Sequence, residues 1–267
     1  MTPGRVATAT IQLSRPSLPL DSVLLCGRHL RLMARRPAWL AEVIVLPLAF
    51  TLLFFTVFQR TMARVGIDYA QYLIPAVIVQ AVFFTALSTA VQAAEDVQSG
   101  LLQRLRCLPV ARAAPSAGLL LAKFASIVIS MAVLIPVGMV LGFRFEAGVL
   151  PATGFVGVAS LFALTLCAGY LALGLTVSRP EGANAFAVLI YFPLLLLSNA
   201  FTTTEAFPDW LEPVVQNQPV TRVIDALRAL STEGADIARP VLAAIVWLVP
   251  LLVLFGLFAT RSFGRMR

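Results

Sequence analysis

A chain of 267 residues with 59% apolar residues, 12% charged residues and a net charge of +7 cannot be an ordinary soluble domain. Soluble domains are about half apolar and a quarter charged, and this chain has too few charged groups to cover a water-facing surface. Lipid must therefore face most of it, as a single helical bundle with short loops. The basic side chains flank apolar runs instead of gathering with aromatic residues on a polar segment, so nucleic-acid binding is not indicated.

The first 36 residues hold six arginines and no apolar core of a signal peptide, which predicts a cytoplasmic tail over residues 1–19. Residues 20–36 have helical spacing. Their apolar face is formed by Val23, Cys26, Leu30 and Met33, and their basic face by Arg28, Arg31 and Arg35. This pattern predicts an amphipathic helix in the membrane interface; a soluble juxtamembrane helix is the alternative. His29 lies among the arginines, and we expect it to be solvated or lipid-facing and not catalytic.

Six apolar stretches follow, each long enough to cross about 30 Å of hydrocarbon as a helix. They lie near residues 39–58, 70–94, 117–142, 152–177, 183–201 and 239–260. None of them alternates with a period of two, so strands are not expected. The predicted fold class is an all-α integral membrane protein with six transmembrane helices.

The distribution of Lys and Arg predicts the orientation. If the N-terminus is cytoplasmic, fourteen of the twenty basic residues lie inside and six lie outside. Inner loops normally carry this excess, so both termini are expected in the cytoplasm.

The centres of the six stretches carry no ionisable side chain, which disfavours a proton-driven carrier. Glu42 and Lys123 lie near the inner edge, where we expect water to reach them. Two polar stripes remain, on the second stretch and on the fifth. Together with the neighbouring aromatic ring they comprise Phe84, Thr85, Ser88, Thr89, Gln92, Asn184, Tyr191 and Ser198. These side chains either make interhelical hydrogen bonds or line a substrate path.

Familiar catalytic motifs are missing from the sequence. It has no G-x-x-x-x-G-K-[ST] loop for ATP phosphates, no G-x-S-x-G nucleophile turn and no zinc ligand set. We therefore expect no catalytic residue, no metal site and no cofactor bound by this chain.

Several loop motifs occur in a characteristic order. Residues 95–112 read EDVQSGLLQRLRCLPVAR, and residues 142–145 read GFRF. The segment between the fifth and sixth stretches contains FPDWL at 207–211, NQPVT at 217–221 and DALRAL at 225–230. In this order the motifs resemble the ABC-2 type permease family, and GFRF resembles its daunorubicin-resistance subgroup.

The resemblance covers residues 20–267, as one ABC-2 type transmembrane domain. It implies a permease subunit of an exporter in the plasma membrane that moves amphipathic drugs or complex envelope lipids outward. Its partners would be two copies of a separate ATPase subunit, which binds ATP and Mg, and a second permease chain, identical or different. A polytopic enzyme acting on lipid and a membrane anchor or assembly factor are the alternatives.

The resemblance also assigns roles to segments of the chain. The 20–36 helix would be the interfacial helix, and 178–182 would be a smaller contact with the ATPase. The cytoplasmic coupling helix would include Glu95, Asp96, Gly100, Leu101, Arg104, Leu105, Arg106, Leu108 and Pro109. Outer re-entrant helices, expected near 208–215 and 220–230, would include Phe207, Pro208, Trp210, Asn217, Pro219 and Arg228.

Overall fold

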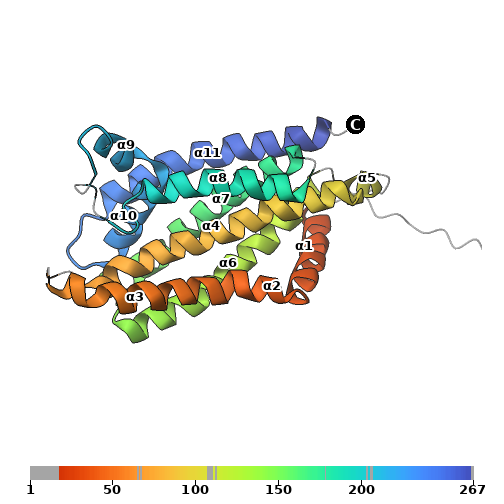
Figure 1. Cartoon of the computed structure of the whole chain (residues 1–267). Coiled ribbons are helices and arrows are strands. Elements are labelled where there is room, and N and C mark those ends of the chain that lie inside the picture. Colours follow the sequence, from red (N-terminus) through yellow and green to blue (C-terminus); the bar gives the residue numbers. More distant parts are fainter. Residues whose placement is uncertain are drawn as a thin grey trace, which may run out of the picture.

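The computed structural model describes residues 18–64, 66, 68–106, 111, 113–177, 179–202, 204 and 207–265, and the regular structure within them is entirely helical. In chain order the elements are α1 (Leu18–Ala34), α2 (Pro37–Leu40), the π-helix η1 (Ala41–Val45), α3 (Leu46–Arg64), α4 (Tyr69–Gln98), α5 (Leu101–Arg106), α6 (Ala114–Leu141), α7 (Val149–Thr176), α8 (Pro180–Leu196), α9 (Glu212–Asn217), α10 (Pro219–Ser231) and α11 (Ala238–Arg265). The long helices run side by side. Figure 1 shows α1 and α5 at one end of the bundle and α9 and α10 at the other.

Five helical segments are long and apolar enough to cross a membrane, as the sequence predicted for five of the six stretches. They are Pro37–Arg64, Tyr69–Gln98, Ala114–Leu141, Val149–Thr176 and Ala238–Arg261. The remaining stretch forms α8, which is apolar but has only 17 residues. The chain is thus a multi-pass membrane protein, and the sixth crossing remains a prediction.

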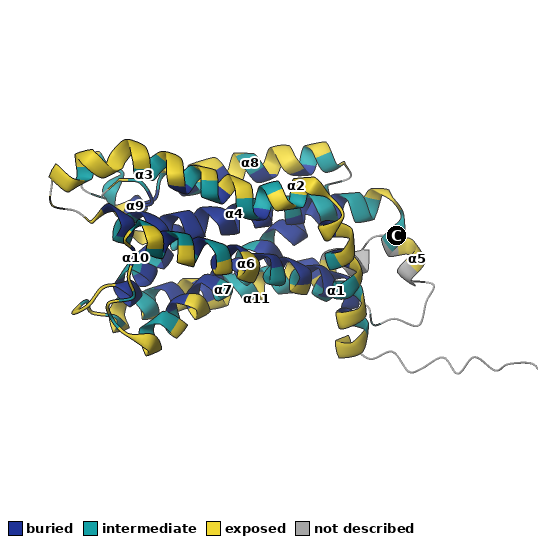
Figure 2. Ribbon diagram, turned by 90° about the horizontal axis from the view of Figure 1, so that it is seen from below, coloured by how far each residue is buried: buried dark blue, intermediate teal, exposed yellow. Residues whose placement is uncertain are grey.

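Helix α4 forms the centre of the bundle and packs against α3, α6, α7, α8 and α10. Figure 2 shows α4 mostly in the buried colour, whereas α3 is largely exposed. Small residues recur along α4 at four-residue intervals, at Ala86, Ala90 and Ala94, and all three are buried. Because lipid does not drive apolar helices together, such small residues favour close backbone packing.

Helix α1 lies across the α5 end of the bundle and packs on α6 (Figure 1). A Cβ at Gly118 of α6 would lie 2.7 Å from Leu25 Cβ, so only glycine permits this close approach. Of the expected apolar face of α1, Met33 is buried and Cys26 and Leu30 pack beside it, whereas Val23 is exposed. His29 is 2% exposed, whereas Val23 is 62% exposed. The expectation that His29 is solvated or lipid-facing was therefore wrong, because packing against α6 selects a face that includes Ser22 and His29.

The opposite end of the bundle is closed by α10, which packs against α4, α7 and α11. Its apolar side chains, including Val223, Ile224 and Leu227, are fully buried. Gln71 of α4 ties the neighbouring loop in place: its Nε2 donates to Arg144 O at 2.9 Å, and its Oε1 accepts from Arg144 N at 2.9 Å. Two short helices lie in this region: α10 coincides with the expected helix at 220–230, whereas α9 begins at Glu212, later than the helix expected at 208–215. Their re-entrant role remains a prediction.

Candidate functional site: a polar cavity beside the coupling segment

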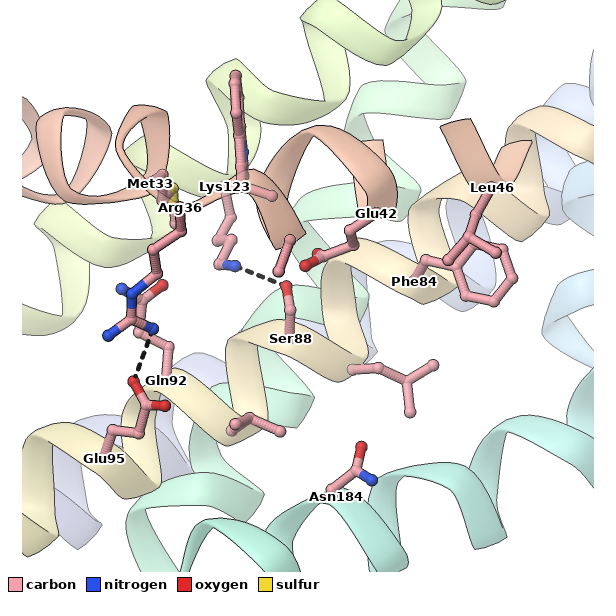
Figure 3. A pocket seen from close by; sticks show the side chains of 14 residues that line it. Met33, Arg36, Glu42, Leu46, Phe84, Ser88, Gln92, Glu95, Lys123 and Asn184 are labelled. Atoms are coloured by element: carbon pink, nitrogen blue, oxygen red, sulfur yellow. Dashed lines mark hydrogen bonds and ion pairs between the residues drawn. The ribbon is translucent and has the colours of Figure 1, made fainter. Parts of the chain in front are cut away.

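A cavity of about 310 Å³ opens between the first membrane helix, α4, α6 and α8, near the end of the bundle that carries α1 and α5. Figure 3 shows side chains from these helices pointing into it. Its lining combines apolar and aromatic groups with several charged and amide groups. The lining residues are Met33, Arg36, Ala38, Trp39, Glu42, Leu46, Phe84, Leu87, Ser88, Val91, Gln92, Glu95, Lys123 and Asn184.

The wall contributed by the first membrane helix is a π-helical segment, η1, which contains Glu42. A π turn displaces backbone carbonyls from the regular α pattern, and such turns are often found at functional sites. Ser130 Oγ of α6 donates to the carbonyl of Val43 inside this segment. Trp39, one turn earlier, donates from Nε1 to Ser126 Oγ at 3.2 Å. These bonds hold the irregular turn, and hence Glu42, against α6.

Lys123 is the most deeply placed charge in the cavity wall. It is only 3% exposed, and its Nζ donates to Ser88 Oγ at 2.6 Å (Figure 3). Ser88 in turn donates to Thr85 O at 3.0 Å, within α4. Lys123 is therefore more deeply buried than its place near the end of an apolar stretch suggests, and it reaches the outside only through the cavity that it lines.

Glu42 supplies the opposite charge, with its carboxylate turned toward Ser88 in Figure 3. Its Oε1 is buried and has no hydrogen-bond partner among the described residues. A buried carboxylate oxygen without a partner is costly, so this group can accept a hydrogen bond from a molecule that enters the cavity.

An ion pair lies at the edge of the cavity, between Arg36 Nη1 and Glu95 Oε2 at 3.1 Å (Figure 3). Both side chains are substantially exposed, so the pair contributes little stability. Its position is more informative, because Arg36 follows α1 and Glu95 lies in the last turns of α4. The pair therefore links the chain after α1 to the end of α4 at the edge of the cavity.

The predicted substrate-path residues divide into two groups. Phe84, Ser88, Gln92 and Asn184 line the cavity. The others are used inside the bundle: Thr85 donates to Ala81 O, Thr89 to Thr85 O and Ser198 to Leu195 O, and Tyr191 packs against Phe83 and Phe84 with its OH 3.5 Å from Gln80 Nε2. The bonds of Thr85, Thr89 and Ser198 stay within their own segments, so the contacts between helices are made by Tyr191, with Gln80, and by Ser88, which accepts from Lys123. Lining of a substrate path by Phe84, Ser88, Gln92 and Asn184 remains a prediction.

The predicted coupling segment begins inside α4. Glu95 and Asp96 belong to its last turns, and Gly100 then adopts a left-handed φ of +68°, which ends the helix. Helix α5 follows over Leu101–Arg106 and includes Leu101, Arg104, Leu105 and Arg106, with Arg104 exposed. It is much shorter than the expected 95–112 helix. Leu108 and Pro109 lie outside the described residues.

Helix α1 contacts the chain near the end of the 95–112 segment. Asp21 Oδ2 of α1 accepts from Ala111 N at 3.0 Å. Arg28 and Arg31 of α1 are exposed, as is Arg35 directly after it. Burial lowers the pKa of His29 from 6.5 to about 4, with the charges of Arg28 and Lys123 acting in the same direction. His29 is therefore neutral at physiological pH.

At the outer-segment end, Arg228 is the best-connected of the predicted residues. Its Nη2 donates to the carbonyls of Tyr72, Asn199 and Ala200 at 3.0–3.4 Å, and its Cζ lies 3.6 Å from the centre of the Tyr72 ring. Burial is the main cause that lowers the pKa of Arg228 and raises that of Asp225. The remaining predicted residues here are spread over the surface: Phe207 and Pro208 precede α9, Trp210 is exposed, Asn217 ends α9 and Pro219 begins α10.

The sequence analysis did not assign Arg36, Trp39, Glu42 or Lys123 to this cavity. A signal was present, because Glu42 and Lys123 are isolated charges near the ends of otherwise apolar stretches, and such groups are often functional. Among the described residues, no cluster of His, Cys, Asp and Glu could hold a metal ion.

Comparison with known proteins identifies the family of this chain. A family model described as ABC-2 type transporter matches residues 22–232. A daunorubicin resistance ABC transporter permease of Streptomyces coeruleorubidus is 31% identical over 194 residues, which are 73% of this chain and 69% of that protein. Two doxorubicin resistance ABC transporter permeases of Mycobacterium tuberculosis are also similar, at 27% identity over 85% of this chain and 82% of the relative, and at 29% over 75% and 71%.

Proposed function

Since this chain belongs to the ABC-2 type transporter family, we propose that it is the membrane permease subunit of an exporter driven by a separate ATPase subunit. ATP and Mg would bind to that partner. Two ATPase copies and a second permease chain would complete the transporter in the cell membrane, with both termini in the cytoplasm and α8 as the sixth crossing.

One observation carries this proposal: a single helix, α4, joins the cavity to the predicted coupling segment. Phe84, Ser88 and Gln92 of α4 line the cavity, and Glu95 of the same helix reaches the cavity entrance. After Gly100 the chain enters α5 directly. Because α4 is continuous over 30 residues, a force applied to α5 by a partner would move one wall of the cavity. The coupling segment comprises the residues assigned to it by resemblance, from Glu95 to Pro109.

The cavity also indicates the kind of cargo. Its wall places Trp39, Phe84 and Leu46 beside the polar groups of Glu42 and Asn184, which suits an amphipathic molecule. A volume of about 310 Å³ is at the small end for a drug-sized ligand. We therefore propose that the second permease chain completes the cargo path, and that the cargo is an amphipathic drug of the kind named in the relatives' titles or a lipid of the cell envelope.

The other segments take supporting roles in this proposal. α1, with Arg28, Arg31 and Arg35, would lie in the inner interface of the membrane. α9 and α10 would be the outer re-entrant helices and would close the exit side, with Arg228 holding them to α4.

The coupling assignment is tested with Gly100→Pro and Leu105→Asp in the assembled transporter. Proline cannot adopt the left-handed backbone of Gly100, so α5 would be misplaced. We expect ATP hydrolysis by the partner to continue while drug export falls about tenfold or more, a barrier increase of about 1.4 kcal/mol. Gly234→Pro is the matched control, because Gly234 also has a positive φ of +73° but precedes α11 at the opposite end. Normal export by both coupling variants would overturn the assignment.

A further inference from the structure

A second pocket, of about 490 Å³, lies at the opposite end of the bundle, between α10 and the start of α11. It is remote in sequence from the polar cavity and shares no residue with it. Its lining residues are Asn217, Arg222, Asp225, Arg239, Pro240, Leu242, Ala243, Val246 and Trp247. The lining thus combines two arginines, Arg222 of α10 and Arg239 of α11, with apolar side chains of α11.

The two arginines use only some of their N–H donors in the contacts that the structure shows. Arg222 donates from Nη2 to Asn217 Oδ1 at 2.9 Å, which fixes one side of its guanidinium. Arg239 lies 3.6 Å from Asp236 through Nε only and is almost completely exposed. The carboxylate in the pocket wall, Asp225, accepts from Asn199 Nδ2 at 2.5 Å. Guanidinium groups with free N–H donors are well suited to phosphate oxygens, which they can bind in pairs.

An apolar stripe continues from this pocket along α11. Leu242 is 63% exposed and Val246 61%, and Val249, Val253 and Leu257 are exposed further along. At 1.5 Å per residue, the stripe from Leu242 to Phe258 is about 24 Å long, which is more than the roughly 15 Å hydrocarbon depth of one leaflet and so can lie along a whole acyl chain. Trp247 lies at the boundary between the charged and apolar parts, as tryptophan commonly does at the membrane interface.

We propose that this pocket binds the phosphate-bearing headgroup of an anionic phospholipid, with Arg222 and Arg239 on the headgroup and an acyl chain along α11. The lipid would come from the leaflet at the α9–α10 end. The two arginines favour an anionic headgroup by charge complementarity. Because the exposed apolar face of α11 begins directly beside them, the pocket suits a lipid better than a free anion. The site does not depend on the proposed transport function.

Trp247 provides a direct test, because bromine atoms on lipid chains quench tryptophan fluorescence on contact. Trp39 and Trp210 are replaced by Phe, and the purified chain is reconstituted in dioleoyl phosphatidylcholine vesicles. Brominated phosphatidylglycerol or brominated phosphatidylcholine is then added at equal mole fractions. We expect phosphatidylglycerol to be preferred at Trp247 about fivefold or more, since each basic residue near a membrane surface attracts anionic lipid.

The pair Arg222→Gln and Arg239→Gln should abolish this preference. The pair Arg60→Gln and Arg64→Gln is the control, because it removes two exposed arginines from α3 and leaves the pocket intact. Equal quenching by the two brominated lipids would overturn the proposal, as would a preference that survives loss of Arg222 and Arg239. Loss of the preference on adding inorganic phosphate would show a free-anion site instead. No quenching by either lipid would show that protein, and not lipid, covers α11.

Discussion

Gly174 of α7 lies directly against the backbone of α4, and we expect Gly174→Ala to separate these two helices. A Cβ at this position would lie 2.2 Å from Ala90 O and 2.8 Å from Ala93 Cβ. Ordinary van der Waals contact begins at 3.4 Å, and the oxygen belongs to the backbone, so a side-chain rotation cannot relieve the clash. Helix α7 must therefore move away from α4 by roughly 1 Å. A gap of this size removes about a quarter to a half of the van der Waals attraction between each pair of atoms that it separates.

The expected cost follows from this displacement. Overpacking a tight core costs about 1–3 kcal/mol, and α4 and α7 form the most extensive helix pair of the bundle. For a domain of this size each kcal/mol lowers the melting temperature by about 2–4 °C. We therefore expect Gly174→Ala to melt about 5 °C below the unsubstituted chain.

The melting temperature can be read from the reactivity of a buried thiol. Cys167 is buried on α7 and becomes reactive toward a fluorescent maleimide when the bundle opens. Cys26 and Cys107 are replaced by Ser so that Cys167 is the single reporter. Gly157→Ala is the control on the same helix, because a Cβ there meets nothing within 4 Å. A melting temperature for Gly174→Ala equal to that of Gly157→Ala would refute the close packing of α4 and α7.

Three further predictions concern stability; the first and third use the same thiol assay, and the pH series uses intrinsic tryptophan fluorescence because maleimide reacts too slowly with thiols at low pH. Lys123→Met removes the donor to Ser88 and the charge near Glu42, so we expect the free energy of unfolding to fall by about 2 kcal/mol. Adding Glu42→Gln should restore part of this loss; a double variant whose loss equals the sum of the two single losses would contradict this coupling. His29 has a pKa of 6.5 when unfolded and about 4 when folded, so the unfolded chain binds more protons between these values. The contribution of His29 to stability should fall by about 2–3 kcal/mol as the pH drops from 6.5 to 4, so the stability difference between the unsubstituted chain and His29→Gln should change by that amount over this range. A difference that is independent of pH would contradict the burial of His29. Arg228→Gln loses three carbonyl partners and the Tyr72 ring, at a cost of about 2 kcal/mol, whereas Arg36→Gln should cost under about 1 kcal/mol because its ion pair is exposed.

The membrane helices were predictable because every residue of a long apolar stretch contributes to the hydrophobicity that identifies it. Each of the five confirmed spans lies within a few residues of the predicted stretch, and the extensions are set by local features such as Asp68, which caps α4 by accepting from Ala70 N and Gln71 N. The short outer helices were also predictable from their amphipathic spacing. By contrast, the 17-residue length of α8 shows that an apolar run alone does not fix where a helix ends.

The cavity was only half predictable, because its lining depends on which helix faces meet. Phe84, Ser88, Gln92 and Asn184 were assigned to a path from their spacing, but the charges that face them come from α6 and from the π turn of the first span. A π turn has no distinctive sequence pattern at Glu42. The burial of His29 was missed for a similar reason: amphipathic spacing identifies an apolar face, whereas Gly118 of α6 determines which face packs closely.

The most direct test of the proposed function is transport of amphipathic cargo, drug or lipid, by the purified chain in sealed vesicles, measured with and without the proposed ATPase subunit. We expect cargo to accumulate only when both subunits and Mg-ATP are present. Accumulation driven by a proton gradient, or ATP-dependent accumulation by this chain alone, would contradict the account.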